Sequence, residues 1–248
     1  MNTIEVATPA KTCQTLFVDS RSIPDDHHRQ THSRELLAVA LKQIAVLKSP
    51  VVLDLGCGSG GSVDFIRSAA PGCRWIGVDI AESPEVDSRK RTDVEFFTFD
   101  GVNIPCDEAS IDLVYCNQAI THAADPFALL QNVRRILKPT GQFIGSCSHM
   151  EPIMSYMRAS ITPYGFEQML NAAGLQLIEL RPGIDAITLI LRRFTARHRF
   201  FNRFFETESP LNRLINIAGK RRRQSARQIN TRKLLFSGQY SFRAAINQ

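Results

Sequence analysis

An acidic residue followed by three glycines has the spacing of a loop that binds a nucleoside cofactor. Asp54 lies in the apolar run Val51–Leu55, and Gly56, Gly58 and Gly60 follow at alternate positions. A glycine-rich turn between a strand and a helix lets the backbone approach a ligand closely. The helix that follows offers free N–H groups and the positive end of its dipole. A carboxylate just before such a turn suits a cationic amino group better than a pyrophosphate.

Two further acids follow the next two predicted strands. Asp79 comes about 20 residues after the glycines, where an acidic side chain accepts hydrogen bonds from ribose hydroxyls. Asp100 follows the third strand, where it could accept a hydrogen bond from an adenine amino group. A strand-end cap is the alternative for Asp79, and a turn before Gly101 is the alternative for Asp100. The three acids in this order favour S-adenosylmethionine over NAD.

Alternating strands and helices are predicted to position these residues. Short apolar runs predict buried strands, and apolar residues at helical spacing predict the helices between them. This order requires a parallel sheet with helices on both faces. The predicted strands are Val51–Leu55, Arg74–Val78, Val94–Phe99, Ile111–Cys116, Gln142–Ser146 and Leu175–Leu180; the predicted helices are Asp25–Lys48, Ser62–Ala70, Ser83–Arg91, Pro126–Leu137 and Tyr164–Ala173.

The two ends of the chain are less regular. Residues 1–23 show no clear periodicity, which is typical of a flexible segment. Residues 184–233 carry apolar groups at helical spacings, divided by Pro210. The run Leu234–Ala244 predicts a final strand whose alternation is interrupted around Gly238 by a bulge or turn.

These features together resemble the class I S-adenosylmethionine-dependent methyltransferases, of the methyltransferase type 11 kind. The resemblance runs from Val51 to Arg181, with a closing strand near Leu234–Ala244, and includes the segments Ile111–Asn117, His122–Pro126 and Leu137–Gln142. Thr140 stands where the family often has the first of two glycines. A NAD-binding Rossmann domain and a non-catalytic relative of the same fold are the alternatives, since fold alone does not fix function.

The resemblance implies a Rossmann-like, doubly wound α/β fold with a seven-stranded sheet whose last strand is antiparallel. It divides the chain into an N-terminal segment (1–23), a core that binds S-adenosylmethionine (24–183), a basic helical cap inserted before the last strand (184–233) and that closing strand (234–248). The residues it implies for cofactor binding are Asp54, Gly56, Cys57, Gly58, Gly60, Asp79, Ile80, Asp100, Gly101, Asn117 and Gln118.

Two histidines are the candidates for a catalytic base. Ligands bind at the carboxyl ends of strands in open α/β sheets, and His122 and His149 follow the fourth and fifth predicted strands. A base assists attack by a neutral hydroxyl, typically by ~10²–10⁴-fold. His122 also has the position of a residue that lines the cofactor pocket or packs at a helix start, and His149 that of a surface loop. The three histidines His27, His28 and His32 indicate either an active-site cover or a solvated helix start.

The positive charge of the chain is concentrated in one segment. The net charge is +6, but residues 192–233 alone hold 13 Lys and Arg against two acids, and the rest of the chain holds 17 against 22. Three interpretations remain for this segment. It is a cap that packs its phenylalanines on the core, a surface for an anionic or lipid-linked substrate at a membrane, or a nucleic-acid-binding surface. The phenylalanines are Phe194, Phe200, Phe201, Phe204 and Phe205.

The remaining features bound the setting of the chain. The six cysteines include no Cys-x-x-Cys pair, so reduced thiols and no metal site are expected. No apolar run approaches the ~18–20 residues that span a bilayer, and the N-terminus lacks the apolar region of a signal peptide. We expect a cytoplasmic methyltransferase that acts at oxygen on a small-molecule, glycan-linked or lipid-linked acceptor. An RNA methyltransferase is the alternative that the basic segment suggests.

Overall fold

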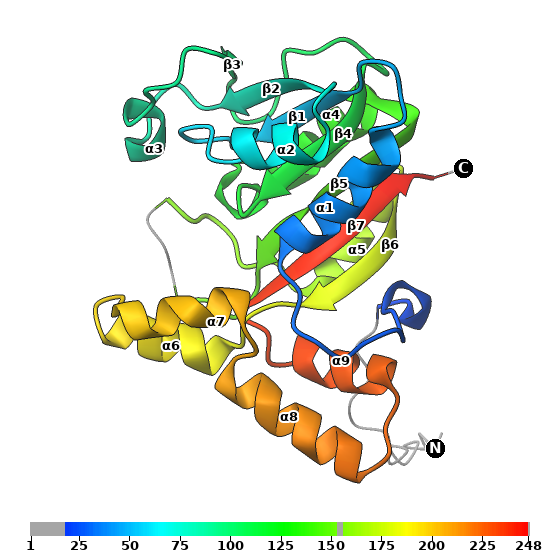
Figure 1. The fold of residues 1–248 in the computed structure, drawn as a ribbon, viewed down its shortest axis with the longest axis vertical. Coiled ribbons are helices and arrows are strands. Elements are labelled where there is room, and N and C mark those ends of the chain that lie inside the picture. The colour runs from blue at the N-terminus through cyan, green and yellow to red at the C-terminus, as the bar shows by residue number, and fades with distance from the viewer. Residues whose placement is uncertain (1–17, 153–155, 248) are drawn as a thin grey trace, which may run out of the picture.

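A seven-stranded sheet forms the centre of the molecule in the computed structural model, which describes residues 18–152 and 156–247. The strand order is β3-β2-β1-β4-β5-β7-β6, and β7 is antiparallel to both of its neighbours (Figure 1). This arrangement confirms the predicted fold class. The strands are β1 (Val51–Leu55), β2 (Arg74–Asp79), β3 (Glu95–Thr98), β4 (Ile111–Asn117), β5 (Leu137–Ser148), β6 (Leu175–Pro182) and β7 (Gln239–Ile246).

Helices cover both faces of the sheet because its central strands are apolar on both sides. On one face, α1 (Ser33–Ile44) and α2 (Val63–Ala69) pack over Val52 and Leu113. On the other face, α4 (Pro126–Ile136) and α5 (Pro163–Ala172) pack over Leu53 and Val114. The short helix α3 (Pro84–Asp87) follows β2. Each of these helices overlaps the range predicted for it.

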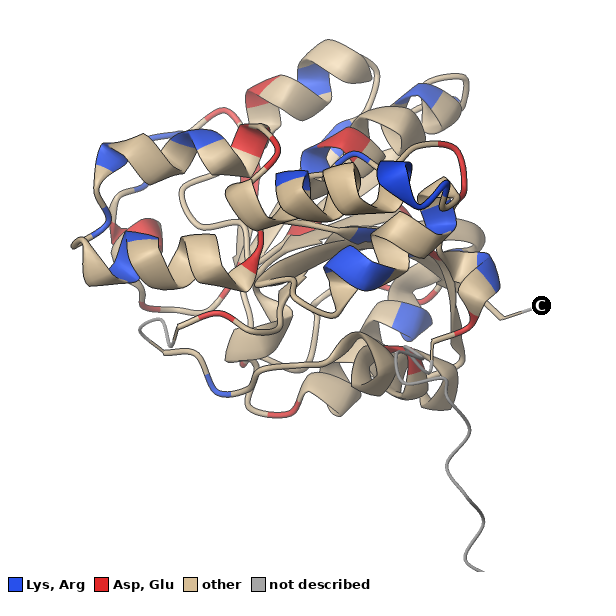
Figure 2. Cartoon of the chain, turned by 90° about the horizontal axis from the view of Figure 1, so that it is seen from below, with Lys and Arg blue, Asp and Glu red and all other residues tan. Residues whose placement is uncertain are grey.

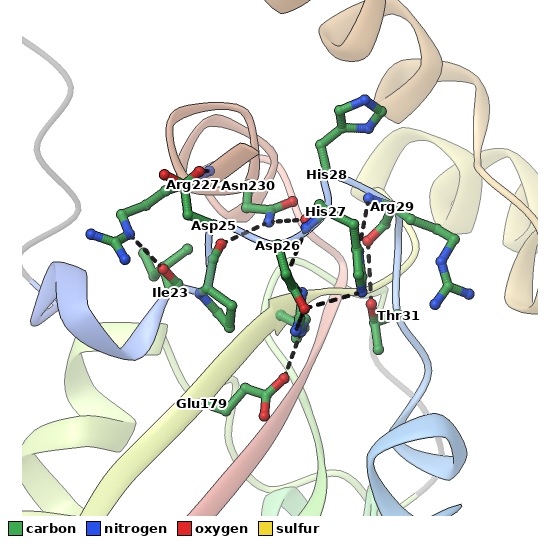
Figure 3. Close-up of polar contacts among 12 residues, drawn as sticks. Ile23, Asp25, Asp26, His27, His28, Arg29, Thr31, Glu179, Arg227 and Asn230 are labelled. Atoms are coloured by element: carbon green, nitrogen blue, oxygen red, sulfur yellow. Dashed lines mark hydrogen bonds and ion pairs between the residues drawn. The ribbon is translucent and has the colours of Figure 1, made fainter. Parts of the chain in front are cut away.

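The first helix begins eight residues later than predicted. Residues 24–32, which we call the strap, contain no helix; α1 begins at Ser33, with His32 and Glu35 forming a capping box. Asp26 does not start a helix because both of its carboxylate oxygens accept hydrogen bonds from Arg181, at 2.7 and 2.8 Å. Figure 3 shows the strap lying between β6 and the C-terminal part of the insertion, where Asn230 donates to the carbonyl of His27.

The inserted segment between β6 and β7 is helical, as predicted. Residues 184–233, here called the insertion, hold most of α6 to α9, which form a separate tier below the sheet in Figure 1. The elements are α6 (Ala186–Phe194), the 3-10 helix η3 (Arg199–Asn202), α7 (Arg203–Glu206), α8 (Pro210–Arg221) and α9 (Ala226–Leu234).

The closing strand is shorter at its start than predicted. Leu234 ends α9, and β7 begins only at Gln239, so the predicted strand over residues 234–238 is wrong. Gly238 holds the turn between them: a Cβ there would lie 2.4 Å from Leu189 Cδ1, and its N–H donates to the carbonyl of Ile184 at 2.8 Å. The interruption of the apolar alternation around Gly238 therefore corresponds to a turn that packs on the insertion.

The described part of the N-terminal segment packs on the core. Ser20–Ser22 form the 3-10 helix η1, and Ile23 is fully buried, whereas residues 1–17 lie outside the described residues. None of the helices in residues 18–152 and 156–247 has both the length and the apolar character needed to cross a membrane.

Candidate functional site

The loop between β1 and α2 reverses the chain at the carboxyl end of the sheet. Gly56, Gly58 and Gly60 all have positive φ, at 76°, 50° and 82°. The N–H groups of Gly56 and Cys57 both donate to the carbonyl of Val78, which ties the loop to β2. A Cβ on Gly56 would lie 2.3 Å from the Cβ of Ala119, just after β4. The loop therefore needs glycine at position 56 for both its conformation and its close packing.

Replacing Gly56 with alanine is expected to lower cofactor affinity at least about tenfold. The substitution combines a positive φ with a collision against the Cβ of Ala119, and backbone strain at such a φ costs about 1–3 kcal/mol. Gly61→Ala is the matched control, because no atom lies within 4 Å of its Cβ position. Titration calorimetry with S-adenosylhomocysteine checks both variants. Equal affinity for the two would contradict this account of the loop.

Asp54 is a buried acid that accepts a hydrogen bond from a neutral group, the hydroxyl of Ser62. Ser62 Oγ donates to its carboxylate, and Ser62 is in turn held by the indole N–H of Trp75 at 3.0 Å. Burial raises the pKa of Asp54 to about 7, Ser62 partly offsets this, and the nearby Asp79 carboxylate adds to the rise. Among the described residues Asp54 forms no ion pair. An ammonium group of a ligand would supply the missing counter-charge, so this acid fits the amino group of S-adenosylmethionine.

Asp79 joins the end of β2 to the glycine loop. Its Oδ2 accepts from the N–H of Gly58 at 2.6 Å, and its Oδ1 accepts from the N–H of Ile80 at 2.8 Å. Each carboxylate oxygen has a further lone pair to offer to ribose hydroxyls. Ile80 is 43% exposed beside it. Cys57 of the glycine loop is buried, and burial raises the pKa of its thiol to about 12, so the thiol stays neutral.

Asp100 forms a turn with the residues that follow it, which is the alternative to adenine binding that the sequence indicated. Its Oδ1 accepts from the N–H groups of Val102 and Asn103 at 2.8 and 2.6 Å, and its Oδ2 accepts from the Asn103 amide. These donors lower the pKa of Asp100. Gly101 follows at a φ of 91°, with open space at its Cβ position. Contact between Asp100 and adenine stays a prediction.

Arg89 belongs to the loop but gave no signal in the sequence. Its Nε donates to the carbonyl of Gly58 at 2.7 Å. Its guanidinium lies over the ring of Phe96, 4.3 Å from the centroid, and Nη2 lies 3.5 Å from Cys57 Sγ. Arg89 therefore joins the glycine loop to β3.

A chain of polar side chains links the carboxyl ends of β4 and β5. Asn117 Oδ1 accepts from Ser146 Oγ at 2.6 Å and from Ser33 Oγ at 3.0 Å. Gln118, at a φ of 66°, donates from Nε2 to Ser146 Oγ at 2.8 Å and accepts from Ser148 Oγ. Ser146 is therefore shared by both predicted residues. No pattern in the sequence indicated the other side chains of this hydrogen-bonded set, which include Ser33, Tyr115, Ser146, Glu151 and Gln239.

The two candidate bases lie on separate loops of this edge. His122 ends the 3-10 helix η2 (Ile120–His122) and is half-buried. His149 directly follows β5 and is also half-buried; its N–H donates to the carbonyl of Gly238. Burial lowers the pKa of His149, which keeps its imidazole neutral near pH 7. Their roles stay predictions.

A small hollow adjoins the polar chain under the insertion. Ser146, Gln239 and Ser241 line it from the sheet, Gln30–His32 from the strap, and Ile184 and Phe205 from the insertion, with Gly183 between. His32 Nδ1 accepts from the N–H of Arg34, so the neutral imidazole carries its proton on Nε2. Burial lowers the pKa of His32, which favours this neutral donor. Of the three strap histidines, His32 both starts a helix and lines a cavity.

The strand order, the antiparallel seventh strand, the glycine loop and the acids after β1 and β2 define the class of this domain. The part of the chain from β1 to β5 is a class I S-adenosylmethionine-dependent methyltransferase domain. Residues 53–145 match the family model described as a methyltransferase domain.

Curated relatives agree over the same region. A demethylmenaquinone methyltransferase of Lactococcus lactis is 25% identical over 114 residues, which are 43% of this chain and 45% of that protein. A candidate S-adenosylmethionine-dependent methyltransferase of Mycolicibacterium smegmatis is 31% identical over 130 residues, 52% of this chain and 49% of that protein. The chain thus spans about half the length of these relatives.

Solved structures show the same fold over most of the chain. The crystal structure of a candidate sarcosine dimethylglycine methyltransferase from Galdieria sulphuraria superposes with a TM-score of 0.59 at 18% identity. The match covers 87% of this chain and 85% of that one, so it extends well beyond the residues that the family model covers.

Proposed function

We propose that this protein transfers the methyl group of S-adenosylmethionine to an oxygen atom of a small or lipid-linked acceptor. The observation that carries the proposal is the position of Ser146, which hydrogen-bonds Asn117 at the end of β4 and also lines the hollow under the insertion. One residue therefore touches both the predicted cofactor side and a separate enclosed space. The relatives named above support a small acceptor, since their names specify demethylmenaquinone and sarcosine or dimethylglycine.

In this proposal, each acid near the glycine loop binds a different part of the cofactor. Asp54 holds the amino group, Asp79 holds the ribose hydroxyls and Asp100 holds the adenine amino group. When bound, S-adenosylmethionine supplies an activated methyl group and its own leaving group. The task left to the protein is to position the acceptor, which is worth up to ~7–11 kcal/mol in well-oriented reactions.

The acceptor's hydroxyl lies in the hollow in this proposal, oriented by the polar groups that line it. Ser146, Gln239 and the Nε2–H of His32 provide the hydrogen bonds, and Phe205 and Ile184 exclude water. His149, on the loop that directly follows β5, is the base to which this proposal assigns the hydroxyl proton, and burial lowers its pKa, which favours the neutral imidazole that a base requires. His122 lines the cofactor pocket.

Replacing His149 with glutamine is therefore expected to lower kcat by about 10²–10⁴-fold, with S-adenosylhomocysteine affinity unchanged within about twofold. His122→Gln should have the opposite pattern: it should weaken the binding of S-adenosylhomocysteine more than it lowers kcat. Because a neutral base is required and burial lowers the pKa of His149, kcat at saturating S-adenosylmethionine should fall only below pH 6.5, the ordinary histidine value. If kcat already falls above pH 6.5 as the pH is lowered, the base is another group with a higher pKa.

The experiment for the proposed function is methyl transfer from methyl-labelled S-adenosylmethionine to separated cell fractions. We expect label in the organic-soluble or small-molecule fraction, and its loss on Ser146→Ala. Label in the RNA fraction would contradict the proposal and favour the RNA methyltransferase. Cofactor binding with no label in any fraction would favour the non-catalytic relative of the same fold.

A further inference from the structure

Helix α6 turns a continuous apolar stripe toward solvent. Ile187, Ile190, Leu191 and Phe194 follow the i, i+3, i+4, i+7 spacing of one helix face, and they are 53%, 53%, 46% and 86% exposed. The opposite side of the helix is occupied separately, since Leu189 packs with the rest of the insertion. Nothing in the described chain covers the outer stripe.

Helix α8 continues the apolar exposure beside α6. Leu214 and Ile217 are 62% and 50% exposed on successive turns of one face. The two helices contact one another. Of the phenylalanines, Phe204 is buried within the insertion, Phe201 and Phe205 are half-buried against it, and only Phe194 and Phe200 are largely exposed. The exposed groups are therefore mostly aliphatic.

Basic residues surround these apolar groups. Over residues 184–233 there are 13 Lys and Arg against three acids, a net charge of +10, and the acid Asp185 is fully buried. Arg197 and Arg199 follow the stripe in the sequence, and Lys220–Arg223 follow the apolar turns of α8. Figure 2 looks onto this side of the molecule, where Lys and Arg recur along the helices.

The combination fits one kind of partner better than the others. The phosphates of a nucleic acid would bind the arginines, but a nucleic acid would not bury the four exposed apolar side chains of the helical stripe. A second copy of the chain would bury the stripe, but a symmetric interface places the same basic residues near one another. An anionic bilayer takes the apolar side chains into the acyl boundary and the arginines among the phosphates.

We propose that the outer face of the insertion, formed by α6 and α8, docks on the surface of an anionic lipid bilayer. The inner face of the same insertion lines the hollow through Ile184 and Phe205. This docking requires no methyl transfer, so its test is independent of the proposed function.

The test is vesicle flotation of the full chain with liposomes of 30% phosphatidylglycerol and 70% phosphatidylcholine, at 50 and 500 mM salt. We expect flotation at low salt, about tenfold less at high salt, and little with phosphatidylcholine alone. The double variant Ile190→Gln and Phe194→Gln should float at least about tenfold less. Its matched control is Val46→Gln with Leu47→Gln, which are 85% and 46% exposed outside the insertion.

A second pair of variants separates charge from apolar contact. Arg221→Gln with Arg222→Gln should float about 30-fold less, at ~1 kcal/mol for each charge near an anionic surface. Lys42→Gln with Lys48→Gln removes the same charge from exposed positions elsewhere and should have little effect. Circular dichroism and S-adenosylhomocysteine binding verify that each variant is folded.

Three results would overturn the proposal. One is no flotation with the anionic vesicles, or the same flotation for the stripe variant and its control. Another is a tight, salt-sensitive RNA gel shift, weakened by the arginine pair, without flotation. The third is a micromolar dimer in analytical ultracentrifugation that the stripe variant dissociates, since the face would then be covered by a second copy.

Discussion

Replacing Asp54 with asparagine is expected to weaken S-adenosylhomocysteine binding by about 10- to 100-fold at pH 7.5. The ligand's ammonium would lose a charge-assisted partner in a buried site, and hydrogen bonds to charged groups are worth about 1.5–3 kcal/mol. Ser62 and Trp75 hold the Asp54 side chain in place, so asparagine keeps the shape and removes the charge. Calorimetry gives the dissociation constant directly.

The pH dependence of that binding tests the same carboxylate. The pKa of Asp54 is raised to about 7, so below this pH a proton occupies the group and affinity should fall by up to tenfold for each unit. Above it the carboxylate is ionised, until the ligand's α-amino group loses its own proton near about pH 8. Affinity should therefore peak between about pH 7 and 8.

The control for this experiment is Asp64→Asn on α2. Asp64 is 81% exposed and pairs only with Arg91 at the surface, so its removal should leave both the affinity and the pH profile unchanged. In the Asp54 variant the fall in affinity on the acidic side should vanish. A variant that binds as tightly as the unaltered chain, with the same profile, would show that Asp54 does not hold the amino group.

Replacing Lys233 with alanine is expected to lower the free energy of unfolding by about 3–5 kcal/mol, the usual result of breaking a buried ion pair. The Lys233 side chain is fully buried, and its Nζ donates to Glu208 and to the carbonyl of His28. Glu208 also accepts from the N–H of Gln30 at 3.1 Å. One ion pair thus joins α9, the segment before α8 and the strap.

Denaturant unfolding measures this effect, and three further variants interpret it. Lys220→Ala removes an exposed lysine from α8 and should change stability by less than about 0.5 kcal/mol. Glu208→Gln should be as damaging as Lys233→Ala, because it leaves a buried ammonium without a counter-charge. Combining Lys233→Met with Glu208→Gln should recover much of the loss. Single variants within about 1 kcal/mol of the unaltered chain would show that the pair does not hold the insertion to the strap.

Local patterns were sufficient to predict most of the core. The buried parallel strands β1, β2 and β4 are short apolar runs bounded by turns, and this pattern depends on no distant residue. The cofactor loop was predictable for the same reason, since Asp54 and its glycines lie within seven residues. The strap was not predictable, because Asp26 does not cap a helix. It accepts hydrogen bonds from Arg181, which lies 155 positions away in the sequence.

The acceptor side shows a second limit of sequence patterns. Ser33, Ser146 and Gln239 come from three distant segments and meet only once the sheet has formed, so no local spacing indicates them. The helices of the insertion were predicted, but their orientation was not. An apolar stripe at helical spacing looks the same in the sequence whether it faces the core or the solvent, and in α6 it faces the solvent.

Calorimetry with S-adenosylhomocysteine on the unaltered chain at pH 7.5 tests the central claim most directly. The architecture places one glycine loop and its acids at one edge of the sheet, so we expect one molecule bound for each chain, with a dissociation constant in the micromolar range. The absence of binding heat, from protein that circular dichroism shows to be folded, would contradict the assignment of this site to S-adenosylmethionine.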